Sequence, residues 1–314
     1  SSDVCSSDLP LPPSVVELEG PFTHEFVHTR GIRLHAATAG SPSDPLVLLL
    51  HSSFGGWFDF KDVIAPIAEQ GFHIAALDMR GFGMSDKPPV EVGQDIRAMV
   101  GDITGAIQAL GHDSAYLVGA DSGGAIAWAV ACERPERTLG LVSVSASHPV
   151  DLRRAMAARP WDFGWLLLRA GLCRLAGPIR RHNPLMRPST YEKELALNTD
   201  SKFPAERRGD VAKLRIQASQ IGNVRRGILW NHRMRTAVPP LSWIDSKVEA
   251  PVLYLHPKQQ LWRPLVRRAE KRTASAFRNA TIAQTKNLPH IESPEAFATM
   301  VSEWLNSHDC ECAK

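Results

Sequence analysis

The 314-residue sequence predicts an α/β fold: an eight-stranded, mostly parallel sheet with helices inserted between its sixth and seventh strands. Apolar runs of strand length alternate with helical stretches through the first half of the chain. After residue 150 the pattern becomes helix-like and Arg-rich, and a strand pattern returns at residues 252–255. No run of 18 apolar residues occurs, so no membrane span is expected.

The individual strands follow from local patterns. Residues 23–29 and 32–39 are predicted to be two strands joined by Arg30 and Gly31. The continuous apolar run at 46–50 is typical of a strand that is buried on both faces of a parallel sheet. Later strands are predicted at 72–77, 116–119, 139–145, 251–255 and 280–283, with helices at 62–70, 92–110, 123–132 and from Pro294 onward.

These elements divide the chain into three parts. Residues 1–20 are expected to be a disordered tail or a scar of sequence assembly. The segment does not resemble a signal peptide, because its start lacks the basic and apolar regions of one. Residues 21–150 and 246–308 are predicted to form the core, and residues 151–245 a helical cap.

The charge and the cysteine content of the chain limit the binding partners and the cellular compartment that we expect. The net charge is +3, yet residues 151–245 carry 18 Lys or Arg against 8 Asp or Glu. We interpret this segment as a solvated basic surface with, at most, weak association with membrane surfaces, and we expect no nucleic-acid partner. The five scattered cysteines favour a reducing, cytoplasmic location. We expect no metal and no cofactor, and a small, apolar substrate.

The strongest motif lies between the strand at 116–119 and the following helix. It runs Gly119-Ala120-Asp121-Ser122-Gly123-Gly124. Small residues on both sides of one reactive side chain are typical of a nucleophile elbow, in which a sharp strand-to-helix turn exposes the nucleophile. This pattern predicts a nucleophile at the tip, on Asp121.

Two loops complete the predicted site. His51, Ser52 and Ser53 follow the strand at 46–50, where this kind of fold supplies an amide for an oxyanion hole. His290 lies in a loop after the last predicted strand and is the expected partner base of Asp121.

Together with the segment Asp78–Pro88, these motifs resemble the epoxide hydrolase and haloalkane dehalogenase branch of the α/β-hydrolase superfamily. The resemblance covers roughly residues 22–307. It implies a two-step hydrolysis: Asp121 attacks an electrophilic carbon to form an ester, and water activated by His290 hydrolyses that ester. The backbone N–H groups of Ser53 and Ser122 would form the oxyanion hole. His51, Trp57 and Trp230 would contact the substrate.

Several positions depart from that branch. Ser52 replaces a usual Gly, and Ser122 replaces the Trp that holds the halide in dehalogenases, which disfavours dehalogenation. Epoxide hydrolases protonate the ring oxygen with cap tyrosines, and Tyr191 is the sole tyrosine in the predicted cap. Gln260 stands where the branch has its triad acid. In a serine protease, an amide in place of the acid slows turnover about 10⁴-fold.

Two alternatives therefore remain beside an Asp121 hydrolase. Shifted by one residue, the motif also fits a serine esterase with Ser122 as nucleophile. The missing acid and scarce cap tyrosines instead favour a catalytically impaired protein that uses the hydrolase fold to bind ligands.

Overall fold

The computed structural model describes residues 10–89, 96–174, 187–234 and 239–312. Eight strands form one sheet in the order β1-β2-β4-β3-β5-β6-β7-β8. The first two strands pair antiparallel, β2 also runs antiparallel to β4, and all later neighbours are parallel. The predicted eight-stranded, mostly parallel sheet is confirmed. The strands are β1 (Thr23–Thr29), β2 (Ile32–Ala39), β3 (Leu46–Leu50), β4 (His73–Leu77), β5 (Ala115–Ala120), β6 (Thr138–Val144), β7 (Val252–Leu255) and β8 (Phe277–Ala280).

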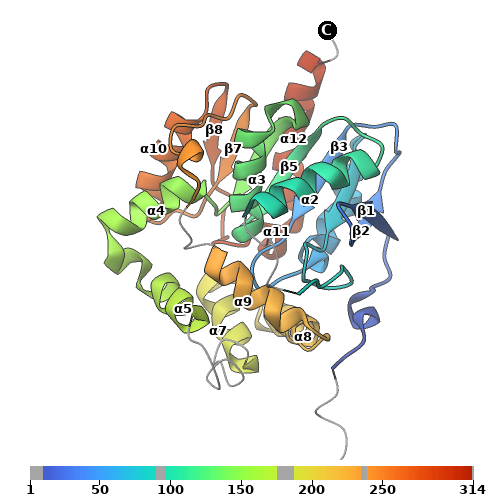
Figure 1. Cartoon of the computed structure of the whole chain (residues 1–314), viewed down its shortest axis with the longest axis vertical. Coiled ribbons are helices and arrows are strands. Elements are labelled where there is room, and N and C mark those ends of the chain that lie inside the picture. Colours follow the sequence, from blue (N-terminus) through green and yellow to red (C-terminus); the bar gives the residue numbers. More distant parts are fainter. Residues whose placement is uncertain (1–9, 90–95, 175–186, 235–238, 313–314) are drawn as a thin grey trace, which may run out of the picture.

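Helices cover both faces of the sheet (Figure 1). Helices α2 (Ile96–Ala109) and α3 (Ser122–Glu133) pack together on one face, and α1 (Lys61–Ala68) packs against α12 (Pro294–Cys312) on the other. With helices on both faces, every residue of β3, β4 and β5 is buried. Such complete burial explains why these strands are apolar runs rather than alternating patterns.

Short turns set the register at the start of the sheet. Thr29 pairs with Ile32, so Arg30 and Gly31 form a two-residue hairpin. Both have positive φ, 46° and 78°. A type I′ turn requires this conformation, and it matches the twist of the flanking strands.

Helices occupy the chain between β6 and β7, as the sequence predicted. They are α4 (Pro149–Ala158), α5 (Gly164–Arg174), α7 (Pro188–Asn198), α8 (Ala205–Ser219) and α9 (Val224–Met234), with 3₁₀ turns at Pro160–Phe163 and Leu241–Trp243. Helix α4 packs against α3 and α10 (Trp262–Arg272) of the core, whereas α5, α7, α8 and α9 lie together beyond one end of the sheet (Figure 1).

Two segments differ from the sequence prediction. The last strand lies at Phe277–Ala280 rather than 280–283, because this edge strand is half-exposed and carries no buried apolar run that would mark it. Residues 10–20, predicted as disordered, pack against the core: Val16 is fully buried, and its carbonyl accepts the indole N–H of Trp57 at 3.0 Å. None of the helices in the described ranges combines the length and hydropathy that a bilayer-spanning segment requires.

Candidate active site

Asp121 lies at the tip of a strained turn between β5 and α3. Its φ of 51° and ψ of −110° are rare for a residue with a side chain. Strained backbone of this kind clusters at functional sites, where the surrounding structure holds it in place. This conformation is the one expected of a nucleophile elbow.

The glycines around Asp121 are required by close backbone contacts. A Cβ on Gly123 would lie 2.3 Å from the carbonyl oxygen of Leu50, and one on Gly119 would lie 2.6 Å from Cα of Gly124. These approaches bring the start of α3 against the end of β3. The small residues of the motif are thus a steric requirement of the turn.

Ser53 holds the Asp121 carboxylate. Its backbone N–H donates to Oδ2 of Asp121 at 3.3 Å, and its hydroxyl donates to the same oxygen at 3.0 Å. The Ser53 hydroxyl also lies 2.9 Å from Oδ1 of the fully buried Asn231 on α9. The loop after β3 therefore contacts the predicted nucleophile, as an oxyanion loop would.

A hydroxyl has one proton, so Ser53 cannot donate to both Asp121 and Asn231. The nitrogen and the oxygen of a side-chain amide occupy nearly equivalent positions, so the Asn231 amide can be rotated by a half-turn without moving its neighbours. This rotation places Nδ2 of Asn231 against the Ser53 hydroxyl. That nitrogen otherwise makes no hydrogen bond to any described residue. The consistent chain then runs from Asn231 N–H to Ser53, and from Ser53 O–H to Asp121.

A close approach of two glycines brings α9 to this position. A Cβ on Gly227 of α9 would lie 2.5 Å from the carbonyl oxygen of Gly81, which follows β4. Without side chains at this crossing, the cap helix packs directly on the core loop. Asn231, one turn further along α9, thereby reaches Ser53.

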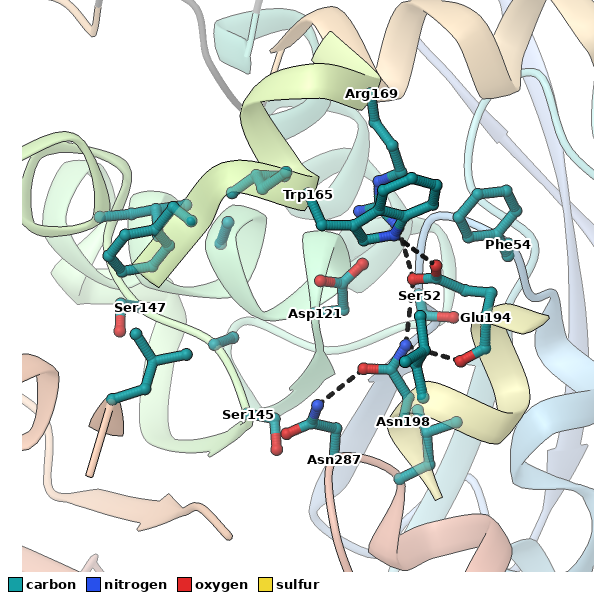
Figure 2. Close-up of a pocket in the computed structure, with 18 of the residues that line it drawn as sticks. Ser52, Phe54, Asp121, Ser145, Ser147, Trp165, Arg169, Glu194, Asn198 and Asn287 are labelled. Carbon is teal, nitrogen blue, oxygen red and sulfur yellow. Dashed lines mark hydrogen bonds and ion pairs between the residues drawn. The ribbon is translucent and has the colours of Figure 1, made fainter. Parts of the chain in front are cut away.

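A cavity of about 330 Å³ opens above Asp121 (Figure 2). This volume suits a small organic substrate. Figure 2 shows the Asp121 carboxylate in the middle of the lining side chains, with Trp165 and Arg169 on one side and Ser145 and Asn287 on the other. Much of the remaining wall is apolar and comes from Phe54, Leu152, Phe163, Leu166, Leu197, Leu261, Trp262, Leu265 and Leu288.

One side of the cavity is a hydrogen-bonded polar wall centred on Glu194 of α7. Its carboxylate accepts the indole N–H of Trp165 at 3.2 Å, an amide N–H of Asn198 at 3.0 Å and the guanidinium of the buried Arg169. Asn198 in turn accepts an amide N–H of Asn287 at 2.7 Å. This chain links α5 and α7 of the cap to the loop that leads to His290.

His290 is buried in the short helix α11 (Pro289–Glu292) and stacks on Phe60, with ring centroids 4.7 Å apart. Neither ring nitrogen has a hydrogen-bond partner among the described residues, and His290 is absent from the cavity lining. Burial lowers the pKa of His290 to about 4; Asp59 opposes this shift and Arg215 adds to it. The imidazole is therefore neutral at neutral pH, as a general base must be.

The charged pair beside His290 has no counterpart in the sequence prediction. Arg215 of α8 donates to both carboxylate oxygens of Asp59, at 3.1 and 2.8 Å, and both side chains are almost fully buried. Ser52 completes the group, with its hydroxyl 3.4 Å from Asp59. This ion pair ties the cap to the 3₁₀ turn Trp57–Phe60 of the core.

Comparison with known proteins agrees with this architecture. A family model described as α/β hydrolase fold matches residues 45–170. The solved structure of epoxide hydrolase A from Mycobacterium thermoresistibile superposes with a TM-score of 0.74 at 21% identity, covering 91% of this chain and 98% of that one. The enol-lactonase from Burkholderia xenovorans LB400 superposes with a TM-score of 0.69 at 18% identity, covering 90% and 100%.

The chain has the α/β-hydrolase fold.

Among curated proteins, part of this chain is similar to several named epoxide hydrolases. Epoxide hydrolase B from Mycobacterium tuberculosis is 38% identical over 125 residues, which cover 39% of this chain and 35% of the relative. Epoxide hydrolase 2 from Siraitia grosvenorii is 36% identical over 148 residues, covering 45% and 46%. The matched segment spans less than half the length of each relative.

Asp121 and Ser122, the two candidate nucleophiles at the elbow, differ in their access to the cavity. Ser122 is the first residue of α3 and is fully buried, and its hydroxyl has no hydrogen-bond partner among the described residues. Asp121 lines the cavity and Ser122 does not. The geometry thus favours Asp121 as the nucleophile over the esterase alternative.

Gln260, at the position where the resemblance places the triad acid, lies in the loop after β7 and is exposed. No hydrogen bond between described residues joins it to a ring nitrogen of His290. Asp151, a carboxylate on α4, which follows β6, is buried and accepts two hydrogen bonds from Arg272, at 2.5 and 3.1 Å. Asp59 is the carboxylate whose charge acts on His290.

Tyr191 lies behind the cavity wall. Its ring packs edge-on against Phe54, with centroids 5.2 Å apart, and it does not line the cavity. Burial raises the pKa of Tyr191 to about 12. Tyr191 is therefore not placed to protonate a substrate in the cavity.

The cavity lining does not include His51, Trp57 or Trp230, the three side chains predicted to contact substrate. His51 is buried, and its Nε2 accepts the backbone N–H of Met79 at 3.1 Å. Trp57 packs against the N-terminal segment, and Trp230 packs against the hydrophobic core. These contacts support the loops around the site.

The segment Asp78–Pro88 also has a structural role. Asp78 is fully buried and accepts hydrogen bonds from the backbone N–H groups of Trp57 and Met84, at 3.1 and 2.9 Å. Burial alone would raise the pKa of Asp78, but its hydrogen bond to His35 and the nearby histidines hold that pKa below the usual value. Asp78 thus fixes the turn that follows the oxyanion loop. Within the described ranges, no three His, Cys, Asp or Glu side chains gather as metal ligands would.

Proposed function

We propose that this protein is a hydrolase of the epoxide hydrolase type, with Asp121 as the residue that forms the ester. The observation that carries the proposal is the position of Asp121: at a strained turn, under a cavity of about 330 Å³, with its carboxylate held by Ser53. The names of the curated relatives support the same substrate class.

In the first step, a carboxylate oxygen of Asp121 attacks a ring carbon of the epoxide. The carbon–oxygen bond of the ring breaks and leaves an alkoxide, which takes a proton from water. In the second step, His290 takes a proton from water, and the hydroxide attacks the ester carbonyl. The backbone N–H groups of Ser53 and Ser122 stabilise the resulting oxyanion, and its collapse breaks the ester bond to the substrate. The departing alkoxide takes the proton that His290 holds, and the diol leaves. The Asp121 carboxyl group then gives its proton to the hydroxide formed in the first step and is a carboxylate again.

The alkoxide needs a hydrogen-bond donor on the cap side, where Tyr191 is not available. Arg169 of α5 lines the cavity and is 4% exposed, and Glu194 holds its guanidinium. A fixed cation in a desolvated wall stabilises a developing negative charge without giving up its own proton. We assign Arg169 this role.

The second step is proposed to be slow. His290 must hold positive charge while it activates water, and a neighbouring carboxylate normally stabilises that charge. Here Asp59, the carboxylate whose charge acts on His290, is already paired with Arg215, and neither ring nitrogen of His290 is hydrogen-bonded to a described residue. We therefore expect the ester on Asp121 to form faster than it breaks down.

Intact mass spectrometry with styrene oxide tests this proposal. The wild-type protein should gain one substrate mass, and hydrolysis in ¹⁸O-water should place the label in the Asp121 carboxylate. Asp121→Asn should abolish the adduct, whereas Ser122→Ala should retain it. An adduct lost in Ser122→Ala and kept in Asp121→Asn would establish the serine esterase instead.

Two further variants locate the base and its acid. His290→Gln should leave adduct formation intact and stop its breakdown. Gln260→Asp speeds breakdown only if the loop after β7 reaches His290. Fast turnover in His290→Gln would contradict the assigned base.

A non-catalytic binding protein is the second candidate. It is favoured by the lack of a hydrogen-bond partner for either ring nitrogen of His290 among the described residues. It predicts that epoxides and their diols stabilise the fold in a thermal-shift assay, with neither adduct nor turnover across a varied panel. That combined result would overturn the hydrolase proposal.

A further inference from the structure

Helix α5 is apolar on both of its faces. Its inner face carries the buried Ala170 and continues from the buried Phe163, and Leu166 lines the cavity. Its outer face continues the preceding 3₁₀ turn, so that Trp161, Trp165 and Leu168 follow one another at helical spacing. These three side chains are 75%, 47% and 53% exposed.

An apolar outer face is unusual for a surface helix, which normally turns polar side chains to solvent. Single exposed apolar residues need no explanation, but a stripe with two tryptophans marks an interaction surface. Figure 1 shows α5 on the outside of the cap, away from the sheet, which agrees with the exposure of these three side chains.

Basic side chains lie next to this apolar stripe and indicate the kind of surface that it would contact. Arg153, Arg154 and Arg159 are exposed on α4 and at its end, directly before the stripe. The cap as a whole carries 18 basic against 8 acidic residues. A second copy of this chain would bring two strongly positive caps together, which repulsion opposes. An anionic surface is attracted instead.

We propose that the outer face of α5 docks on the surface of an anionic lipid bilayer. Tryptophan and leucine side chains would enter the boundary between headgroups and acyl chains, and the arginines of α4 would contact lipid phosphates. Trp165 belongs to both the outer stripe and the cavity lining. Docking would thus set the cavity rim against the bilayer, from which an apolar substrate can enter.

The test is flotation of the full-length protein with lipid vesicles. Vesicles of phosphatidylcholine with about one-third phosphatidylserine should carry the protein, and pure phosphatidylcholine vesicles should carry much less, since each basic residue near an anionic surface adds about 1 kcal/mol. The double variant Trp161→Ser, Leu168→Ser should reduce bound protein at least tenfold.

Matched variants separate the apolar and charged contributions. Phe26→Ser removes a 43% exposed aromatic side chain from β1, on the opposite side of the molecule, and should leave binding unchanged. Arg153→Gln, Arg154→Gln should weaken binding to the anionic vesicles and reduce its salt dependence. Adduct formation with soluble styrene oxide, which reports on the site itself, should be unaffected by all three variants.

Three results would overturn the proposal. One is the absence of binding to anionic vesicles. Another is an equal loss of binding in Phe26→Ser. The third is a dimer, measured by analytical ultracentrifugation, that Trp161→Ser dissociates, because the stripe would then be a contact between copies. Since adduct formation is measured separately, failure of the docking proposal leaves the proposed function testable.

Discussion

Replacing Arg215 with Met should destabilise the protein and change the titration of His290. Arg215 and Asp59 form a two-fold hydrogen-bonded ion pair with side chains that are 3% and 0% exposed. Without Arg215, the one side-chain hydrogen bond to the buried Asp59 carboxylate that remains among the described residues is that of the Ser52 hydroxyl, at 3.4 Å. Breaking such a buried pair from one side costs about 3–5 kcal/mol.

For a chain of this size, that loss corresponds to a fall in Tm on the order of 10 °C. The double variant Asp59→Leu, Arg215→Met removes both charges and should recover most of the loss, because desolvation of the pair offsets much of its attraction. Urea unfolding of the wild type, both single variants and the double variant gives the coupling free energy. A double variant as unstable as Arg215→Met would refute this account of the pair.

The same variant has an effect that simple destabilisation would not produce. The Arg215 charge lowers the pKa of His290 and the Asp59 charge raises it. Arg215→Met should therefore raise that pKa above about 4, and Asp59→Leu should lower it further. NMR titration of ¹⁵N-histidine measures both shifts. In Arg215→Met, Asp59 no longer pairs with an arginine and can stabilise the positive charge on His290, so the ester on Asp121 should also break down faster. An unchanged pKa of His290 and an unchanged rate of breakdown would refute the electrostatic coupling between the ion pair and His290.

Three further outcomes are expected. Gly123→Ala should abolish adduct formation and lower Tm, because its methyl group would meet the Leu50 carbonyl at 2.3 Å. Gly209→Ala on α8, where an added Cβ meets no other part of the fold within 4 Å, should keep adduct formation and raise the stability by up to about 1 kcal/mol, because Ala favours a helix over Gly. Thermal unfolding and intact mass measure both, and an active Gly123→Ala protein would contradict the elbow geometry. His290 should contribute about 3 kcal/mol to the fall in the free energy of unfolding between pH 6.5 and about pH 4, because the unfolded chain binds a proton on His290 that the folded protein resists. Urea titrations of His290→Leu should therefore show a shallower pH dependence than the wild type, and equal slopes would contradict this contribution. Asn231→Leu should slow adduct formation about tenfold by leaving the Ser53 hydroxyl without its donor, and an unchanged single-turnover rate would remove Asn231 from the site.

Much of the fold could be predicted because its signals are contiguous in the chain. The run Leu46–Leu50 is apolar because neighbours cover both faces of β3, and Arg30 with Gly31 can form only a tight turn between two strands. The elbow is also local: Gly119 and Gly123 flank Asp121, and their missing side chains permit the backbone contacts of the turn. The edge strand β8 was predicted a few residues too late, and the order of residues 10–20 was missed, because the contacts that stabilise both segments come from distant parts of the chain.

The buried contacts of the cap and the surroundings of His290 could not be predicted in the same way. Arg169 and Arg215 are two of many arginines in a basic segment, and nothing in their neighbours distinguishes them from exposed ones. They become buried because Glu194 and Asp59 meet them from elements that are 25 and 156 positions away in the chain. Likewise, a typical loop position indicated Gln260, and its being the sole tyrosine of the predicted cap indicated Tyr191. Packing turns Gln260 to solvent and places Tyr191 against Phe54, outside the cavity lining.

The sequence by itself therefore determined the sheet, the helical insertion and Asp121 as the residue at the tip of the elbow, because backbone sterics and burial patterns act over a few neighbouring residues. Tertiary structure alone decided which charges surround His290 and which donors face the cavity. Buried charges are stable only where a partner arrives from another element, and that meeting depends on how the whole cap packs on the core.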